Sequence, residues 1–384
     1  MDEKQLLMIP GPTAVPQSIL LAGAHPMVNH RGPEFRAALE ACTEGLKRVF
    51  QTSHEVYILT ASGTGGLEAA IVNTLSPGDK ILSVSIGVFG DRFATIAETY
   101  GADVEKMDFP MGSAADPEMI RKRLDQDGAK DIKAVLLTHN ETSTGVTNDL
   151  ATICPIIRKH GALILVDGIS SLVAMDCQMD AWGIDVLVAG SQKAFMIPPG
   201  LCFIAMSDRA RAAMEQAKTP RFYFDLEKAR SYLELGQTPW TPAVPQVFQL
   251  EQGLALLEKE GLQSCFRRHA RLAKAVREGV KALGLKLLAD ESCASNAVTS
   301  VRRPDGVEVA DLRKLMQQKY GVVLAGGQAS LKTEIFRIGH LGYVSPADIL
   351  ATLGLLGLAL KDLGLSVNPA AGVSAAVMVL GEAA

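Results

Sequence analysis

Short apolar runs alternate with amphipathic segments through the first two-thirds of the chain, and this alternation limits the fold more than any other feature. The runs have strand length, and helix-like stretches lie between several of them. The apolar runs are Val56–Thr60, Lys80–Ser85, Ala134–Thr138, Ala162–Asp167, Asp185–Ala189 and Leu201–Met206. The helix-like stretches are Thr64–Asn73, Asp91–Tyr100, Pro117–Gln126 and Leu150–His160. Continuously apolar strands are buried on both faces, so the pattern predicts an α/β fold with a largely parallel sheet covered by helices.

The alternation ends in a proline-rich stretch, QTPWTPAVP at 237–245. Before it, the runs 185–189 and 201–206 are joined by a loop alone, which allows an antiparallel strand there. After it, we expect an amphipathic helix from about Pro245 through Glu260 and, past Gly261, on to Leu283. The later strand-like segments are Ala297–Val301, Gly321–Leu324 and Ile335–Ile338.

A chain of 384 residues is too long for one compact core, so two domains are expected. The predicted division is an N-terminal arm over 1–20, a large domain over 21–265 and a smaller α+β domain over 266–384. The run 367–384 is rich in Ala, Val and Gly and is barely long enough to span a bilayer. We expect it to form a helix packed on the protein surface or on a partner subunit.

Charge and cysteine content exclude several classes of function. The formal net charge is −4, which gives no reason to expect nucleic acid or an anionic membrane as partner. None of the six cysteines lies within three residues of another, so metal and redox sites based on paired cysteines lack their local signature. Such scattered cysteines are typical of buried thiols in a reducing compartment. The acidic N-terminus has no long apolar core, so no signal peptide is predicted and a cytoplasmic location is expected.

Ligands of open α/β sheets bind outside the carboxyl ends of the strands, so the residues that follow each strand are the first candidates for a ligand site. The run 56–60 leads into SGTGG at 62–66, which opens a helix. Small residues let backbone amides approach an anion, and the helix N-terminus adds partial positive charge. The sequence is neither a Walker loop nor the GxGxxG fingerprint. It indicates a phosphate-binding turn, although a plain strand-to-helix connection explains such a turn about as often.

Three further strand ends carry polar residues. The cluster HNETSTG at 139–145 follows the run 134–138, either as a ligand site or as a capped loop. Asp167 follows four apolar residues, and a buried carboxylate needs a partner such as a pyridinium nitrogen, or a helix to cap. Lys193, in GSQKAF, follows the run 185–189 and is either a nucleophile toward an aldehyde or an ordinary surface lysine. Taken together, these features suit a cofactor with one phosphate, one ring nitrogen and one aldehyde.

At this point the chain resembles a known family. The motifs SGTGGLEA, THNETSTG, LVDGISS and GSQKAF..PPG are similar to those of the class V aminotransferases of pyridoxal-phosphate fold type I. Within that class, the chain resembles alanine–glyoxylate and serine–glyoxylate aminotransferases, and cyanobacterial proteins labelled the small (tritium-exchange) subunit of a soluble hydrogenase. The resemblance runs from IPGPTAVP near the N-terminus to IFRIGHLGYVS. It implies a mainly parallel seven-stranded sheet and pyridoxal 5'-phosphate as cofactor.

The resemblance also implies residue roles. Lys193 holds the cofactor as a Schiff base and moves a proton between substrate and cofactor, while Asp167 pairs with the ring nitrogen. Arg337 binds the substrate carboxylate, and Gly11 lies against the substrate. The other implied contacts are Thr64, Gly65, Gly66 and Gln192 at the phosphate, Thr142 at the phenolic oxygen, Phe89 and Ile169 on the two ring faces, and Thr241 from a second subunit at the phosphate. The resemblance therefore implies a homodimer with a shared active site.

Some positions depart from the family pattern. Phe89 stands where the alanine–glyoxylate enzymes often have Trp, Gly66 replaces a side-chain donor, and Thr238 stands where some relatives have Tyr. The phosphate would therefore depend more on backbone amides, which affects cofactor affinity more than mechanism.

The implied reaction is a ping-pong transamination from alanine or serine to glyoxylate, with small amino acids and 2-oxo acids as partners. A small pocket bounded by Gly11 and Phe89 suits short side chains. One alternative is another class V enzyme, with a different 2-oxo acid acceptor or with cysteine desulfurase or kynureninase activity. A desulfurase would stack His where Phe89 stands and carry a catalytic cysteine on a mobile loop.

The remaining alternatives lie outside transamination. A soluble-hydrogenase-associated or electron-transfer subunit would need paired cysteines for its metal centres, and the sequence has none. The last alternative is a binding protein of the same fold without catalytic activity. The presence of Lys193, Asp167 and Arg337 argues against it.

Overall fold

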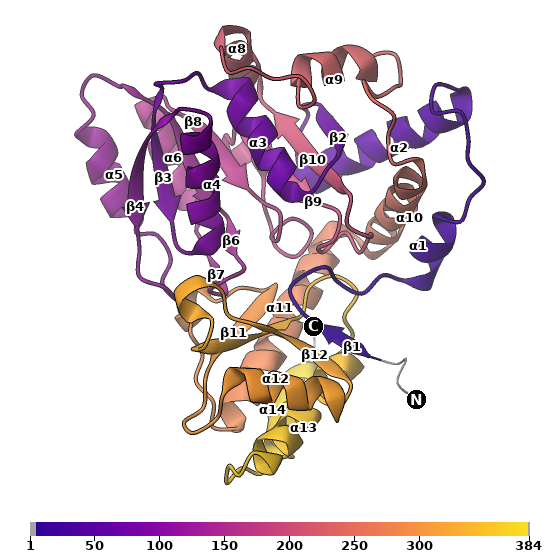
Figure 1. Ribbon diagram of the computed structural model, residues 1–384, viewed down its shortest axis with the longest axis vertical. Helices are drawn as coiled ribbons and strands as arrows, with labels where there is room; N and C mark the ends of the chain where they lie inside the picture. Colours follow the sequence, from indigo (N-terminus) through magenta and orange to yellow (C-terminus); the bar gives the residue numbers. More distant parts are fainter. Residues whose placement is uncertain (1–4, 383–384) are drawn as a thin grey trace.

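Two main β-sheets organise the computed structural model, which describes residues 5–382 (Figure 1). The larger sheet has seven strands. In spatial order they are β2 (Val56–Thr60), β10 (Leu201–Met206), β9 (Val186–Gly190), β8 (Leu163–Asp167), β5 (Ile132–Thr138), β3 (Lys80–Ser85) and β4 (Asp103–Asp108). Only β10 runs in the direction opposite to the other six. The mainly parallel seven-stranded sheet and its antiparallel strand after β9 are therefore confirmed.

Helices cover both faces of the large sheet because its strands are apolar on both sides. One face packs against α2 (Pro33–Phe50), α5 (Pro117–Asp125), α6 (Leu150–His160) and α10 (Val244–Glu260). The other packs against α3 (Gly63–Thr74), α4 (Val88–Thr99), α8 (Asp208–Gln216) and α9 (Leu226–Leu233). The central strand β8 illustrates the cause, since Ile164 and Val166 enter the first core while Leu163 and Leu165 enter the second.

Strand β4 was not predicted from the sequence. It lies at the sheet edge, and its residues DVEKMD lack an apolar run. Its charged side chains pair with residues of the neighbouring helices: Glu105 binds Arg123 of α5, and Lys106 lies 2.6 Å from Asp91 of α4. Edge strands commonly carry such charges, which discourage pairing with other chains and also hide the strand from a search for hydrophobic patterns.

The smaller sheet contains β1 (Leu6–Met8), β12 (Val322–Gly326), β13 (Ile335–Gly339) and β11 (Val298–Arg302), in that order. The last three were predicted to within about two residues, whereas β1 was not predicted. Three residues of the N-terminal arm pair in parallel with β12, as Figure 1 shows. The arm is therefore part of the small sheet before it crosses to the large one.

Helices from the C-terminal part of the chain cover this sheet. They are α11 (Leu262–Ala282), α12 (Val309–Gln318), α13 (Pro346–Asp362) and α14 (Ala371–Gly381). The predicted long helix is divided at Gly261, whose φ of +80° ends α10 before α11 begins. The predicted C-terminal helix is confirmed as α14, which packs on α11 and α13, and its residues 383–384 lie outside the described range. Within residues 5–382, no helix has the length and apolarity needed to cross a membrane.

The N-terminal arm passes close over β13 at Gly339. A Cβ atom built on Gly339 would lie 2.2 Å from the carbonyl carbon of Ile9 and 2.5 Å from the nitrogen of Pro10. Both neighbours are backbone atoms, so no side-chain rotation can make room. The absence of a side chain at Gly339 is therefore what allows the arm to lie here.

We predict that Gly339→Ala displaces the arm and lowers the free energy of unfolding by about 1–3 kcal/mol, as overpacking does in a dense interior. Urea denaturation would measure the loss. The matched control is Gly128→Ala, because a Cβ atom there meets nothing within 4 Å. Its effect should stay within about 1 kcal/mol. Equal stabilities of the two variants would contradict the prediction.

Candidate active site

The polar residues singled out in the sequence lie at the carboxyl ends of adjacent strands. Asp167 is the last residue of β8, the cluster 139–145 follows β5, and Lys193 comes three residues after β9 ends. Since β5, β8 and β9 are neighbours and parallel, these groups meet at one edge of the sheet. The tertiary structure thus brings together residues far apart in the sequence.

Asp167 is a buried carboxylate with an incomplete set of partners. Its side chain is 4% exposed, and the backbone N–H of Ile169 donates to its Oδ1 at 2.9 Å. The pKa of Asp167 is raised to about 7, mainly by burial and in part by the charge of Glu141, although the hydrogen bond from Ile169 and the charges of Lys193 and Arg92 act to lower it. A cation placed against this carboxylate would therefore be bound strongly.

Lys193 lies against the N-terminal arm. Its Nζ donates to the carbonyl of Pro10 at 2.6 Å, and a Cβ atom on Gly11 would lie 2.4 Å from that Nζ. Burial lowers the pKa of Lys193 to about 8, against the opposing charge of Asp167. About a fifth of the amine is thus neutral near pH ~7.4, far more than for an exposed lysine, and a nucleophilic lysine requires this neutral form.

The turn that was expected to bind an anion is the first turn of α3. The helix begins at Gly63 after Ser62, and no side chain caps its end. The amides of Gly63, Thr64 and Gly65 accordingly have no carbonyl partner within the helix. Gly66 differs, because its N–H already donates to the Ser62 carbonyl at 3.3 Å.

The missing side chain of Gly66 has a packing role. A Cβ atom there would lie 2.6 Å from Cγ1 of Val188 in β9 and 3.2 Å from Sγ of Cys202 in β10. Gly66 therefore allows α3 to lie close on the sheet. Its predicted contact with a phosphate stays a prediction.

The cluster after β5 is organised around Ser170. The Thr142 hydroxyl donates to Ser170 Oγ at 2.8 Å, and the Asn140 side-chain amide donates to the same oxygen at 2.9 Å. The Thr142 carbonyl accepts a hydrogen bond of 2.9 Å from Nη1 of Arg337. Thr142 therefore connects the strand ends of the large sheet with Arg337 of the small one.

Glu141 is a site residue that the sequence reasoning left without a role. Its carboxylate accepts from the backbone amides of Phe89 at 3.0 Å and Gly90 at 3.1 Å, and from the Ser143 hydroxyl at 2.6 Å. It is fully buried, and this burial raises its pKa. Glu141 thus fixes the start of α4 and, with it, the position of Phe89. Its place in a polar cluster after a strand was the available signal.

Phe89 and Ile169 lie on separate elements near the strand ends. Phe89 is half-buried in the first turn of α4, and the Arg92 guanidinium lies 4.7 Å from its ring centroid. Ile169 packs on α3, since a Cβ atom on Gly63 would lie 2.6 Å from its Cδ1. Ile169 therefore borders both Asp167, through its amide, and the phosphate-binding turn.

Arg337, in β13, is a buried cation. It is 6% exposed, its Nε donates to the Gly326 carbonyl at 2.8 Å, and Nη1 donates to Thr142. Burial lowers its pKa to about 10. Both acceptors are neutral carbonyls, and the charge of Glu141 acts on Arg337 without a direct ion pair among the described residues, so a carboxylate could still pair with the guanidinium.

Two predicted site residues lie at the margin of this arrangement. Gln192 precedes Lys193, and its Oε1 is buried without a hydrogen-bond partner among the described residues. Thr241 is exposed in the loop before α10, where it lines a small cavity with Thr60 and Tyr223. No hydrogen bond within the described range joins Thr241 to the other site residues, as expected if it serves a second subunit.

The residues present fit pyridoxal phosphate. Asp167 offers a buried carboxylate to a ring nitrogen, and the open amides at the start of α3 offer donors to a phosphate. Lys193 supplies an amine whose pKa is already lowered to about 8.

Known proteins with similar sequences point the same way. Residues 17–345 match the family described as Aminotransferase class-V. The chain is 47% identical to the soluble hydrogenase small subunit of Synechococcus sp. (strain PCC 6716), with both chains fully covered. It is 38% identical to the L-aspartate–glyoxylate aminotransferase of Paracoccus denitrificans, over 98% of this chain and 96% of that one. It is 36% identical to the serine–glyoxylate aminotransferase of Arabidopsis thaliana, over 96% and 94%.

The fold agrees with a solved structure of similar size. The ureidoglycine–glyoxylate aminotransferase of Bacillus subtilis superposes with a TM-score of 0.93 at 29% identity, covering 100% of this chain and 99% of that one. The agreement includes the small sheet and the C-terminal helices, since almost nothing of either chain is left uncovered.

We predict that cofactor-free protein captures pyridoxal phosphate at a rate that rises with pH and is half-maximal near pH 8. Only the neutral amine attacks an aldehyde, and the pKa of Lys193 is lowered to about 8. An exposed lysine would show its midpoint near pH ~10.4. The measurement is the absorbance change on mixing across a pH series, with Lys193→Ala as the blank. A midpoint close to that of an exposed lysine would show that burial does not tune this amine.

Proposed function

Because the chain belongs to the class V aminotransferase family, we propose that it transfers an amino group from alanine or serine to glyoxylate by a ping-pong mechanism. The chain is an aminotransferase of fold type I, and its cofactor is pyridoxal phosphate. One observation carries the aminotransferase chemistry: the Lys193 amine lies at the same edge of the large sheet as the buried Asp167 carboxylate, and Arg337 reaches the same cluster through its hydrogen bond to the Thr142 carbonyl.

The cofactor, when bound, supplies an electron sink for the α-carbon of an amino acid. The chain's own residues do the rest. Lys193, as a neutral amine, takes the proton from the α-carbon of the substrate and delivers it to the cofactor. Asp167, buried and ionised against a cation, holds positive charge on the ring nitrogen. Arg337 orients the substrate through its carboxylate, with two parallel hydrogen bonds available to its guanidinium.

Glyoxylate as acceptor is supported by the names of relatives with three different donors. The enzymes from Paracoccus denitrificans, Arabidopsis thaliana and Bacillus subtilis all carry glyoxylate in their names. Gly11 also leaves little room, since a Cβ atom there would touch Nζ of Lys193. Space beside the lysine is thus limited, which suits a two-carbon acceptor and short donors.

The cysteine desulfurase alternative gains no support from the placement of the cysteines. Five of the six are buried in the cores on the two faces of the large sheet. The sixth, Cys293, is half-buried against the Gly112 carbonyl. Burial raises the pKa of Cys202 to about 12 and that of Cys154 to about 12. Thiols in this state are poor nucleophiles.

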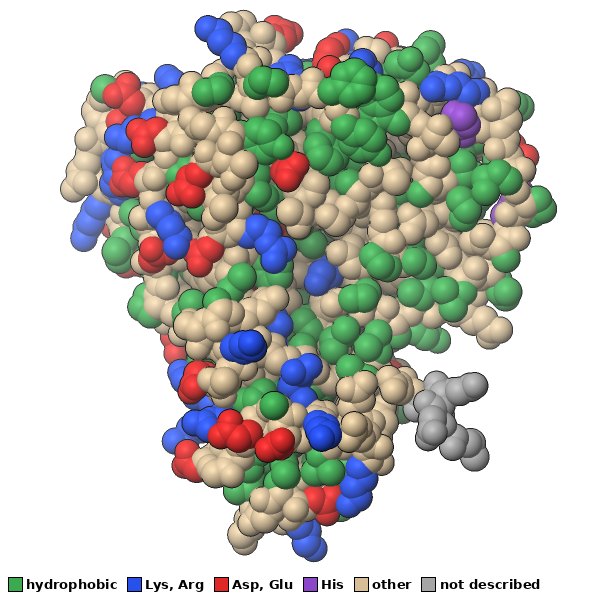
Figure 2. Space-filling view, in the orientation of Figure 1, with side chains coloured by type: hydrophobic (Ala, Val, Ile, Leu, Met, Phe, Trp, Pro, Cys, Tyr) green, Lys and Arg blue, Asp and Glu red, His purple; other side chains and the backbone are tan. Residues whose placement is uncertain are grey.

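We also propose that the enzyme is a homodimer with a shared active site. Phe222 and Tyr223 are 71% and 45% exposed, and both stack on Trp240, beside Thr241. Figure 2 shows hydrophobic side chains gathered on the upper part of the molecule. Exposed aromatic clusters of this kind mark protein–protein contacts, and a second copy placed here would bring Thr241 near another phosphate-binding turn.

The domain division 1–20, 21–265 and 266–384 stands as a further proposal, together with a cytoplasmic location. Cys265 packs in the core of the large sheet. Leu272, about two turns later in α11, packs in the core of the small sheet. The change of core within α11 supports a boundary close to residue 265.

We expect steady-state turnover with alanine or serine and glyoxylate, and a weaker rate with 2-oxoglutarate as acceptor. Parallel lines in double-reciprocal plots would support the ping-pong order. Lys193→Ala should lower kcat by at least about 1,000-fold, and borohydride should then fail to fix the cofactor to the chain. A clear preference for 2-oxoglutarate would overturn the glyoxylate assignment.

Thr241→Ala should weaken cofactor binding about 10-fold, the effect of losing one hydrogen bond to a charged group. The sharper test mixes Thr241→Ala with Lys193→Ala and lets subunits exchange. If Thr241 serves the partner, each mixed dimer has one site with both residues intact, so activity should rise above that of either variant. Thr238→Ala is the control, because it lies in the same loop with its hydroxyl bound to the Trp240 carbonyl at 2.7 Å. A monomer by sedimentation would refute the shared site.

A further inference from the structure

A buried hydroxyl at the end of β5 has no hydrogen-bond partner among residues 5–382. Thr138 is the last residue of that strand and is 1% exposed, and its Oγ1 neither donates to nor accepts from a described group. A hydroxyl removed from water without a partner costs free energy, and such groups are uncommon in folded proteins. The neighbours of Thr138 in the sheet suggest what the hydroxyl is for.

Thr138 stands beside Asp167. The two are register partners in the parallel strands β5 and β8. Paired residues of neighbouring strands point to the same face of the sheet, and the strands lie about 4.8 Å apart. Two residues earlier, the pair Leu136 and Leu165 packs in the core under α3 and α4. By this alternation, the Thr138 hydroxyl and the Asp167 carboxylate face the same side, next to each other.

The Asp167 carboxylate has room for such a donor. Its Oδ1 accepts from the Ile169 amide, and within the described range no hydrogen bond reaches its Oδ2. An ionised carboxylate offers about four acceptor positions, so a ring nitrogen would leave at least one open. The charged groups that act on it are Glu141, Lys193 and Arg92, and none of them donates a hydrogen bond to it.

The cofactor would make this bond stronger. The pKa of Asp167 is raised to about 7, so its carboxyl group is partly protonated near neutral pH in the cofactor-free chain. A cationic ring nitrogen placed against Asp167 would keep the carboxylate ionised. A hydroxyl bonds about twice as strongly to an ionised acceptor as to a neutral one. Rotation about the χ1 torsion of Thr138 is enough to redirect its hydroxyl.

We propose that Thr138 is a positioning residue that donates its hydroxyl to the Asp167 carboxylate when the cofactor is bound. The bond stabilises the ionised carboxylate and thereby keeps the proton on the ring nitrogen. Thr138 acts through Asp167 alone. Because the pairing of Asp167 with the ring nitrogen belongs to the proposed function, the role of Thr138 rests on that proposal.

The test uses pyridoxal phosphate and an analogue in which carbon replaces the ring nitrogen. Titration of the cofactor-free, full-length chain should show pyridoxal phosphate binding at least about 10-fold more tightly, since only it offers Asp167 a charged partner. Thr138→Val has the same shape without the hydroxyl. It should weaken pyridoxal phosphate about 10-fold and leave the analogue within about twofold. An unchanged affinity for pyridoxal phosphate, or an equal loss for both compounds, would overturn the proposal.

Two further variants show whether the hydroxyl itself is responsible. Thr138→Ser keeps the hydroxyl and should bind pyridoxal phosphate within about threefold of the unmodified chain. A loss as large as that of Thr138→Val would refute the proposal. Ser83→Ala is the matched control, because Ser83 in β3 is also 1% exposed with an unpartnered hydroxyl, but is paired with the apolar Leu136. It should leave both affinities within about twofold.

Stability separates positioning from packing. Removing a buried hydroxyl without a partner relieves a cost, so the Tm of cofactor-free Thr138→Val should not fall. The rise in Tm on adding the cofactor should be smaller than in the unmodified chain, because binding is weaker. If Thr138→Val does not fold, Thr138→Ala replaces it, and an unchanged ratio of the two affinities refutes the proposal.

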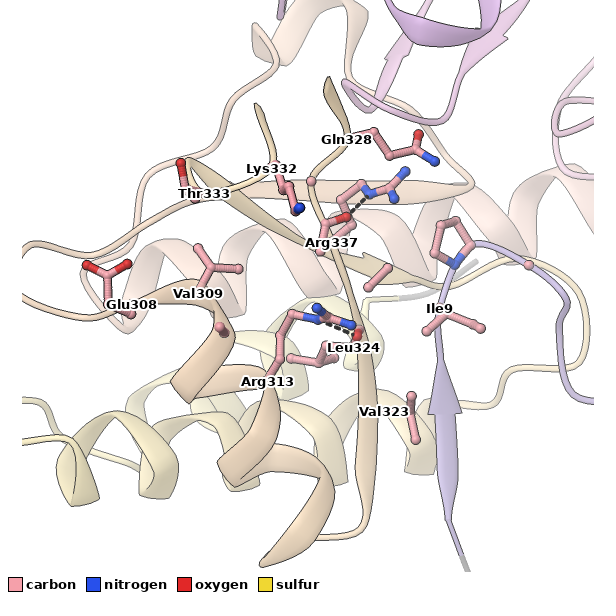
Figure 3. Close-up of a pocket in the computed structure, with 16 residues that line it drawn as sticks. Ile9, Glu308, Val309, Arg313, Val323, Leu324, Gln328, Lys332, Thr333 and Arg337 are labelled. Carbon is pink, nitrogen blue, oxygen red and sulfur yellow. Dashed lines mark hydrogen bonds between the residues drawn. The ribbon is translucent and has the colours of Figure 1, made fainter. Parts of the chain in front are cut away.

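Kinetics distinguish Thr138 from residues that touch the substrate. A cavity of about 570 Å³ lies between Arg337 and the N-terminal arm at Ile9 (Figure 3). Neither Thr138 nor Asp167 lines it. Thr138→Val should therefore lower kcat about 10-fold and leave KM for the amino donor within about twofold. A higher KM with unchanged kcat would contradict an action through Asp167.

The outcomes also separate Thr138 from the proposed function. If the unmodified chain binds the two compounds equally, the roles of Asp167 and Thr138 both fail. If it prefers pyridoxal phosphate and Thr138→Val keeps the whole preference, only the role of Thr138 fails. If no donor reacts with glyoxylate, the proposed substrates are wrong, and the two affinities still decide the role of Thr138.

Discussion

The burial of a carboxylate at the end of the central strand is the constraint on which the site depends. Asp167 ends β8, with β5 and β9 on either side, so water cannot solvate its charge. Such a group is costly unless a cation accompanies it. Within residues 5–382, its partners are a hydrogen bond from Ile169 and the charges of Lys193 and Arg92. A cationic ring placed against Asp167 would therefore relieve the cost of burying this carboxylate and would be bound favourably. The other site residues are arranged around that position.

The N-terminal arm connects the parts that act together. It begins as β1 in the small sheet, passes over Gly339, touches Lys193 with Pro10, and then fixes the lysine loop through Thr13. Thr13 donates its hydroxyl to the Lys193 carbonyl at 3.0 Å. The arm thus joins the small sheet to the loop that carries the lysine.

Much of the fold could be predicted because burial on both faces leaves a strong pattern. The strands β2, β3 and β10 were predicted with their observed limits, and Gly261 was recognised as the break between two helices. The edge strand β4 and the arm strand β1 could not be predicted in this way. β4 carries charges that its neighbours pair, and β1 has only three residues, so its strand conformation depends on β12, more than 300 residues away.

The sequence by itself determined the order of the strands and helices, the strand ends that carry Asp167 and Lys193, and, through family likeness, the cofactor. These are local properties, since they depend on which residue follows which. Only the tertiary structure decided that Glu141 fixes the start of α4, that Gly66 serves packing, and that Arg337 of the small sheet donates to Thr142 beside the large one. Each of these depends on contacts between distant segments. No pattern along a single segment encodes such contacts, because burial and charge act through space.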